Sequence, residues 1–169
     1  MKSKSLVLSA VLLGMGTVLH LLTPSMIMGV KPDFLLVMMF MCLYLIKDMK
    51  SALIISVSAG TIAALTTGFP MGQLPNILDK LVTGFLVFQV FKIRHHHLTV
   101  TQMGILVGVG TLVSGLIFLS SGFFLLQQME MVIPSLSIVI ITMPINAGLA
   151  MMVYKSLVLS LTKSQMIVK

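Results

Sequence analysis

Long apolar runs alternate with short polar clusters along the whole chain, and most runs approach the length that crosses a lipid bilayer. A transmembrane helix needs about 20 predominantly apolar residues to cross a hydrocarbon core of about 30 Å. The pattern predicts six such helices, at residues 5–22, 31–46, 51–67, 75–91, 99–126 and 132–154. We therefore expect an all-α integral membrane protein with a single membrane domain over residues 1–169.

Prolines affect where the second and fourth predicted helices start and where the sixth bends. The apolar run at 34–46 is too short to span at about 1.5 Å per residue, so we extend its helix back to Lys31. Pro32 is tolerated in a first helical turn, and the positive end of the helix dipole stabilises the negative charge of Asp33 there. The fourth helix is predicted to start near Pro75 for the same reason, and the sixth to bend at Pro144.

The composition supports the membrane assignment. Of the 169 residues, 57% are hydrophobic and 9% are charged, against about a quarter charged in a soluble domain. These values exclude a soluble globular domain and a disordered chain, and a single cysteine excludes an internal disulfide scaffold. The net charge of +7 does not indicate a nucleic-acid partner, because the basic residues stand singly or in pairs at the ends of apolar runs.

The distribution of lysine and arginine predicts the orientation in the membrane. With six spans both termini lie on one side, and placing them in the cytoplasm leaves only Lys31 and Lys80 outside. The positive-inside rule favours this arrangement. The nine basic residues then on the cytoplasmic side are Lys2, Lys4, Lys47, Lys50, Lys92, Arg94, Lys155, Lys163 and Lys169.

The two outer lysines each stand close to an aspartate, in Lys31-Pro32-Asp33 and in Asp79-Lys80. A free amino acid carries one carboxylate and one ammonium, and each needs a partner of opposite sign once it is desolvated. Two mixed pairs would suit such a zwitterion. Charges that simply mark the interfacial ends of helices are the alternative.

The connection at 66–80 is rich in hydrogen-bonding side chains and holds two glycines and two prolines. This polarity favours a binding loop over a plain connector. The alternative is that Gln73 or Asn76 serves only to cap backbone groups.

Small residues recur at helical spacing in two predicted helices. Gly104 and Gly108 form a GxxxG motif, which favours close packing within the bundle. In the first helix, contact with a partner subunit competes with internal packing as the explanation. The small residues there are Ser5, Ser9, Ala10 and Gly14.

Few polar side chains are expected inside the membrane, and each needs an internal partner. Asn146 could bond a carbonyl freed by Pro144 or face a cavity, and His20 could face the same pocket. The others are Gln89 and the hydroxyls around Ser114, Ser120 and Ser121. No Walker, nucleophile-elbow or HExxH motif is present, and no carboxylate pair is expected deep in the bilayer, so neither an enzyme nor a proton-driven pump is indicated.

No metal or cofactor is predicted. The 16 methionines are scattered and suit adaptable packing better than copper coordination. The triple histidine His95–His97 is better explained as part of a basic cytoplasmic loop.

Three stretches carry a resemblance to a known family. They are KPDFLLVMMFM at 31–41, ALTTGFPMGQLPNILDK at 64–80 and GTLVSGLIFLSS at 110–121. The chain resembles the TrpP-like tryptophan transport proteins, the tryptophan-specific S components of energy-coupling-factor (ECF) transporters. The second stretch is the most specific, and the length and six-span layout are also similar.

The resemblance implies a substrate-binding subunit in a bacterial cell membrane that holds L-tryptophan near the outer face. Such S components associate with a transmembrane T subunit and two cytoplasmic ATPases, whose hydrolysis of ATP is thought to topple the S component. In the first helix Ala10 and Gly14, with Ser5 and Ser9 as a second small pair, would meet the T subunit.

For tryptophan, Asp33 or Asp79 would bind the ammonium and Lys31 or Lys80 the carboxylate. The remaining candidate binding residues are Phe69, Met71, Gln73, Asn76 and Asn146, with Met38 as a further wall of the indole slot. Two alternatives stay open: an S component for another hydrophobic amino acid or an aromatic vitamin, and a six-helix scaffold that transports nothing.

Overall fold

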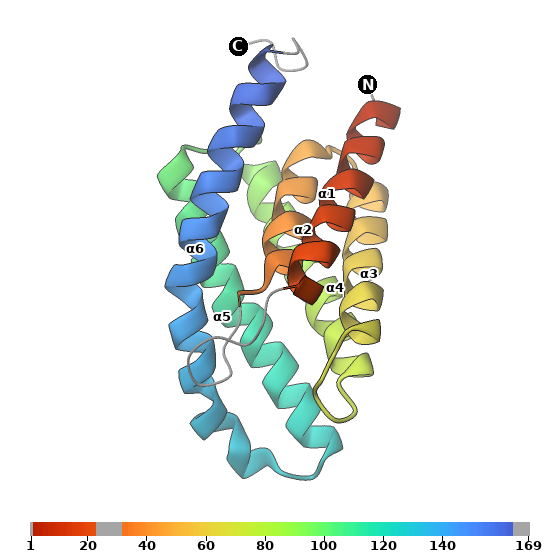
Figure 1. Cartoon of the computed structure of the whole chain (residues 1–169), viewed down its shortest axis with the longest axis vertical. Helices are drawn as coiled ribbons and strands as arrows, with labels where there is room; N and C mark the ends of the chain where they lie inside the picture. Colours follow the sequence, from red (N-terminus) through yellow and green to blue (C-terminus); the bar gives the residue numbers. More distant parts are fainter. Residues whose placement is uncertain (1, 23–31, 164–169) are drawn as a thin grey trace.

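The computed structural model describes residues 2–22 and 32–163, and in these residues the chain is helical throughout, with short connections (Figure 1). The elements are α1 (Lys2–Leu22), α2 (Phe34–Leu45), α3 (Met49–Leu65), α4 (Gln73–Ile93), α5 (Val100–Leu125), the short 3-10 helix η2 (Met129–Met131) and α6 (Val132–Lys163). Four segments are long and apolar enough to cross a membrane: α1, α4, α5, and η2 with α6. Helices α2 and α3 are shorter.

The short helix α2 is the centre of the bundle. It packs against α1, α3, α4, α5 and α6, and every side chain from Leu35 to Leu43 is buried. A helix that is apolar all round is expected in such a position. Because protein surrounds its 12 residues, about 18 Å long, the bilayer thickness does not set its length. Around it, neighbours in sequence pair as α1 with α2, α3 with α4, and α5 with α6.

The helix bounds lie within three residues of the predicted spans except at the end of α6, and the start of α2 differs for a clear structural reason. Helix α2 starts at Phe34 rather than at Lys31, because the Asp33 side chain accepts the backbone N–H of Leu36 and so caps the helix from outside it. Pro32 therefore precedes the helix instead of lying in its first turn, and Lys31 lies outside the described residues. Helix α6 runs past Tyr154 to Lys163 and continues through Pro144.

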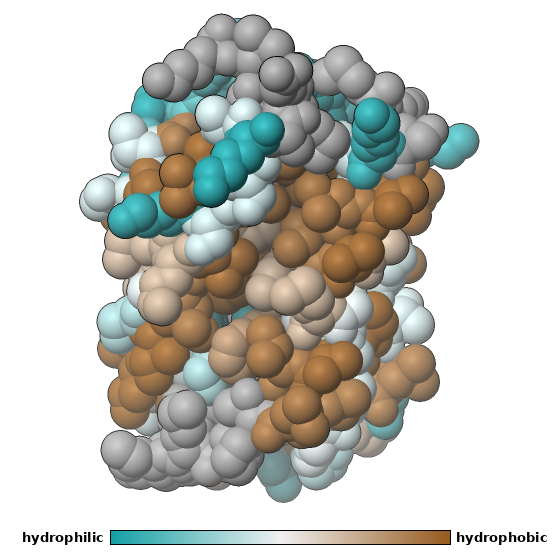
Figure 2. Space-filling model, turned by 45° about the horizontal axis from the view of Figure 1, so that its top comes forward, coloured by the Kyte–Doolittle hydropathy of each residue, from teal (hydrophilic) through white to brown (hydrophobic). Residues whose placement is uncertain are grey.

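Basic side chains gather at one end of the bundle. Helix α1 begins and α6 ends at that end, where the α2–α3 and α4–α5 connections also lie (Figure 1). Figure 2 shows hydrophilic side chains near this end and a mainly hydrophobic surface over much of the rest of the visible face. The exposed basic residues in α1, in α6, in these connections and in the helix turns beside them are Lys4, Lys47, Lys50, Lys92, Arg94, Lys155 and Lys163.

The α4–α5 connection at the same end is held by His96. Its ring stacks on Phe91, and its Nδ1 lies 2.9 Å from the backbone oxygen of Tyr44. Burial lowers the pKa of His96. Among the described residues, no group of histidine, cysteine and acidic side chains is arranged to hold a metal ion.

Glycines allow close helix contacts at two interfaces. The GxxxG residues face α6: a Cβ on Gly104 would lie 2.6 Å from Met151 Cγ, and one on Gly108 would lie 3.6 Å from Ala147 Cβ. Between α3 and α4 the glycine faces backbone rather than a side chain: a Cβ on Gly60 would lie 2.9 Å from the Cα of Ile77. Small residues that let backbones approach are the usual means of packing membrane helices.

We expect Gly60→Ala to lower the stability of the fold by about 1–3 kcal/mol, the usual range for overpacking. The atoms that a new methyl group would meet all belong to the backbone of α4, at Asn76 and Ile77, so no flexible side chain can move aside. Thermal unfolding in detergent measures the loss. Gly148→Ala is the matched control, because its Cβ would meet nothing within 4 Å; equal melting temperatures for the two variants would contradict the prediction.

Candidate functional site

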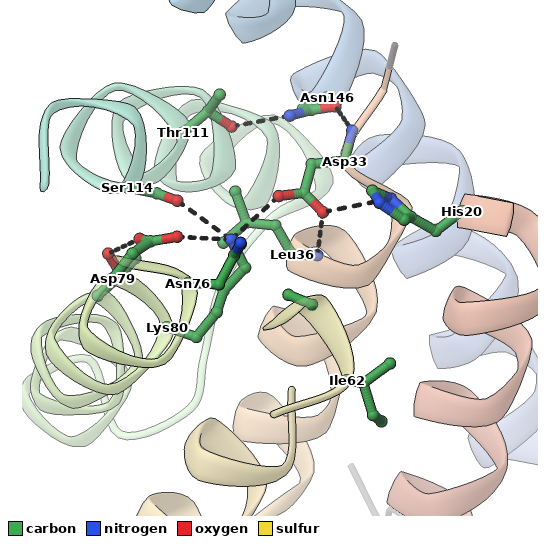
Figure 3. Close-up of polar contacts among 12 residues, drawn as sticks. His20, Asp33, Leu36, Ile62, Asn76, Asp79, Lys80, Thr111, Ser114 and Asn146 are labelled. Atoms are coloured by element: carbon green, nitrogen blue, oxygen red, sulfur yellow. Dashed lines mark hydrogen bonds and ion pairs between the residues drawn. The ribbon is translucent and has the colours of Figure 1, made fainter. Parts of the chain in front are cut away.

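The ammonium of Lys80 lies at the centre of a buried charged cluster (Figure 3). Its Nζ donates to Asp79 Oδ2 at 2.6 Å and to Asp33 Oδ2 at 3.1 Å, and lies 3.4 Å from Ser114 Oγ. Lys80 itself is only 3% exposed. Three helices meet here: α2 begins just after Asp33, α4 carries Asp79 and Lys80, and α5 carries Ser114. A buried lysine with such partners is stable only as part of a paired network.

The two carboxylates are held differently. Asp79 is 1% exposed, and its second oxygen accepts a hydrogen bond from Thr83 Oγ1 at 3.0 Å. Asp33 keeps 29% of its side chain exposed. Its Oδ1 accepts the N–H of Leu36 at 2.9 Å and lies 3.9 Å from Nδ1 of His20. Asp79 is therefore enclosed, while Asp33 faces open space.

Asn146 connects α6 to the two neighbouring elements. Its Oδ1 accepts the backbone N–H of Asp33 at 3.0 Å, and its Nδ2 donates to Thr111 Oγ1 at 3.2 Å (Figure 3). The side chain is fully buried. Both bonds go to neighbouring elements, and neither goes to a carbonyl near Pro144.

A cavity of about 180 Å³ lies beside the cluster, between α2, α4, α5 and α6. Charged, amide and hydroxyl groups line part of it, and Leu36, Phe118 and Val139 supply apolar wall. The other lining residues are Asp33, Asn76, Asp79, Lys80, Thr111, Ser114, Gly115, Thr142 and Asn146. A concave site with an apolar wall and a few convergent polar groups is the usual form of a small-molecule site.

Five of the sequence-predicted site residues line this cavity: Asp33, Asn76, Asp79, Lys80 and Asn146. The amide of Asn76 donates to the backbone oxygen of Gly72 at 2.8 Å, so this residue also has the capping contact that was the alternative. The two carboxylates meet at one ammonium although no carboxylate pair was expected. Residues 33 and 79 lie far apart in sequence, and only the packing of α2 on α4 brings them together.

Other predicted residues lie elsewhere. Phe69 packs edge-on against Phe118 and Phe123, behind the cavity wall. Met71 and Gln73 are exposed and are not among the lining residues: Met71 lies in the turn closed by the Gly72 N–H and Phe69 O, and Gln73 is the first residue of α4. Met38 is buried in the core near Gly16, and Lys31 is outside the described residues.

Several cavity residues escaped prediction. Thr111, Phe118 and Thr142 line the cavity, and Ser114 was noted only as one of several hydroxyls inside the membrane. Thr111 and Ser114 are three residues apart, which places both on one helical face. That spacing of polar groups in an otherwise apolar helix was the available signal.

Comparison with known proteins identifies the family. The family model described as "Tryptophan transporter TrpP" matches residues 2–162, nearly the whole chain. The chain belongs to this family of tryptophan transporters. The resemblance carried by the three sequence stretches is thus confirmed.

Three relatives of the TrpP family carry the name "Probable tryptophan transport protein". The Bacillus subtilis relative is 42% identical over 121 residues, which cover 72% of this chain and 70% of the relative. The relative from Clostridium acetobutylicum is 41% identical over 127 residues, covering 72% and 71%. The relative from Clostridium perfringens is 29% identical over 98% of this chain and 97% of its own length. No solved structure shows significant similarity.

The small residues of α1 divide between two faces in this TrpP-family member. Ser9 is buried, and its backbone oxygen lies 3.4 Å from the Cys42 sulfur of α2, while Ser5 is half-buried. Ala10 and Gly14 are exposed, and nothing lies within 4 Å of a Cβ placed on Gly14. The pair Ser5 and Ser9 thus packs toward the bundle, and the pair Ala10 and Gly14 lies on the outer surface.

Proposed function

We propose that this chain is the substrate-binding S component of an ECF-type uptake transporter that imports L-tryptophan across a bacterial cell membrane. One observation carries the proposal: in a chain of the TrpP family, one buried ammonium and two carboxylates line a single cavity. A zwitterionic amino acid needs groups of both signs when it leaves water.

The cavity suits an aromatic amino acid in size and chemistry. At about 180 Å³ it is below the roughly 300 Å³ at which pockets for drug-sized ligands begin. Leu36, Phe118 and Val139 offer apolar contact for a ring, and the hydroxyl of Ser114 lies within the same lining. A buried indole N–H usually finds such an acceptor.

Energy for uptake would come from partner proteins. The sequence holds no Walker motif, so ATP hydrolysis requires separate ATPase subunits. The exposed Ala10 and Gly14 on α1 give a smooth surface for a transmembrane T subunit, since small residues let helix backbones approach closely. With the basic end in the cytoplasm, both termini are cytoplasmic. The lining residues Asp33, Asn76 and Asp79 lie at the starts of α2 and α4, which are the ends of these helices away from the basic end (Figure 1), so the cavity is then nearer the outer side.

A fluorescence titration tests the substrate. The chain contains no tryptophan, so added L-tryptophan supplies the indole emission. With purified protein in nanodiscs we expect a saturable blue shift and a rise in anisotropy, reversed by few competing amino acids or aromatic vitamins. Stronger competition by one of these ligands would assign a different substrate. No binding of any of them to folded protein would favour the non-transporting scaffold.

The carboxylate pair favours a second candidate, a proton-coupled carrier that works alone, because intramembrane carboxylates commonly relay protons in transporters. Uptake into proteoliposomes separates the two. An S component needs the T subunit, the ATPases and internal ATP, whereas a proton-coupled carrier imports tryptophan by itself when a pH gradient is applied. Gradient-driven uptake by the chain alone would overturn the S-component proposal.

A further inference from the structure

The charges around the cavity do not balance. Asp33, Asp79 and Lys80 line it, and in the part of the chain that the structure describes they give the lining two formal negative charges and one positive. Both carboxylates already contact the single ammonium. A buried excess of negative charge is costly until a cation joins it. A bound ligand that brings a cation removes this cost, while one that brings only an anion raises it.

The two carboxylates offer unequal access to such a cation. Asp79 is 1% exposed, and each of its oxygens has a partner, Lys80 on one and Thr83 on the other. Asp33 is 29% exposed, and a carboxylate can accept about four hydrogen bonds, of which the described contacts occupy two. The open capacity at the cavity therefore belongs to Asp33.

We propose that Asp33 receives the ammonium of the ligand and that this ammonium, not the carboxylate, is the charged group for which the site selects. Asp79 acts as a positioning residue that holds Lys80. The inference rests on the proposed function and deepens it, because it names the class of ligand: a protonated aromatic amine, with or without a carboxylate.

After Lys80, His20 is the next titratable group beside the open carboxylate among the described residues, with Nδ1 at 3.9 Å from Asp33 Oδ1. A protonated His20 would supply the missing positive charge and weaken the preference for an amine. The test is therefore made at about pH 8, well above the ordinary histidine pKa of about 6.5. Lys31, two residues before Asp33 and outside the described residues, is examined through Lys31→Gln, for which we expect the ligand preference to persist.

Three indole ligands distinguish what the ammonium and the carboxylate each contribute to binding. L-Tryptophan carries both groups, tryptamine lacks the carboxylate and indole-3-propionate lacks the ammonium. Their affinities for the full chain in nanodiscs are measured by indole emission. For the unmodified protein we expect tryptamine to bind within about tenfold of tryptophan, and indole-3-propionate at least ~100-fold more weakly, as expected when a buried carboxylate stays without its cation.

Two matched variants assign the effect to one carboxylate. Asp33→Asn keeps the helix cap, because asparagine caps as well as aspartate. In it we expect tryptophan to bind about 100-fold more weakly and indole-3-propionate to bind more tightly, so that the preference for the amine is lost. In Asp79→Asn we expect both ligands to weaken together, with their ratio preserved. A role of Asp33 in folding alone would leave that ratio unchanged.

Two results would overturn the inference: equal binding of indole-3-propionate and tryptophan by the unmodified protein, or an unchanged ligand ratio in Asp33→Asn. Loss of the amine preference in Lys31→Gln would assign the selection to Lys31 and overturn it as well. Failure of the folded protein to bind tryptophan at all contradicts the proposed function instead. The two failures are thus distinguishable in one set of titrations.

Discussion

The double variant Lys80→Met/Asp79→Asn is expected to lose tryptophan binding by at least ~30-fold while remaining folded. Among the described residues that line the cavity, Lys80 supplies the ammonium, and it also holds in place both carboxylates, including Asp33, which receives the amine of the ligand. Removing one partner of a buried, hydrogen-bonded charge pair costs about 2–5 kcal/mol, a factor of roughly 30 to several thousand in affinity. Exchanging both members of the Lys80–Asp79 pair removes one charge of each sign from the protein interior.

The single variant Lys80→Met separates binding from folding. It leaves Asp33 and Asp79 without their ammonium, so we expect a lower melting temperature than in the double variant. Lys92→Gln is the matched control, because Lys92 is exposed at the far end of the same helix. Tryptophan titration and thermal unfolding in detergent give both quantities. Wild-type affinity in the folded double variant would remove Lys80 from the binding site.

Asn146→Leu is expected to weaken tryptophan binding by about 10- to 100-fold. The substitution leaves the N–H of Asp33 and the hydroxyl of Thr111 without the partner that each has on α6. A buried polar group without a partner costs about 1–3 kcal/mol. The bond from the backbone N–H of Asp33 to Asn146 fixes the start of α2. Its loss therefore also lets the Asp33 carboxylate, which faces the cavity, move from its position.

Thr142→Val provides the control for this variant. Thr142 lines the same cavity on the same helix, but its hydroxyl bonds only within α6, to the backbone oxygens of Ile138 and Val139. We expect Thr142→Val to change the affinity less than about threefold, since no bond between helices is lost. Equal affinities for Asn146→Leu and Thr142→Val, measured in the same titration, would show that the contact between α6 and α2 does not support the site.

The sequence determined the class of the protein, because the requirement for apolar residues in lipid acts locally along the chain. It correctly predicted the six helical segments, the gathering of basic residues and the tryptophan transport family. Of the residues that line the cavity, it selected Asp33, Asn76, Asp79, Lys80 and Asn146. An ionisable or amide side chain in so apolar a chain is rare, and rarity itself marks it as a candidate.

Only the tertiary structure decided which of these groups meet. Apolarity places a residue in a helix but does not say which helix will face it, and side-chain partners depend on how the helices pack. The sequence paired Asp33 with Lys31 and Asp79 with Lys80, whereas packing of α2 on α4 gives one ammonium to both carboxylates. Packing of α5 against α4 adds Thr111 and Ser114 to the cavity. Met71 and Gln73, just before α4 and at its first position, are exposed, because side-chain direction follows backbone geometry rather than residue type.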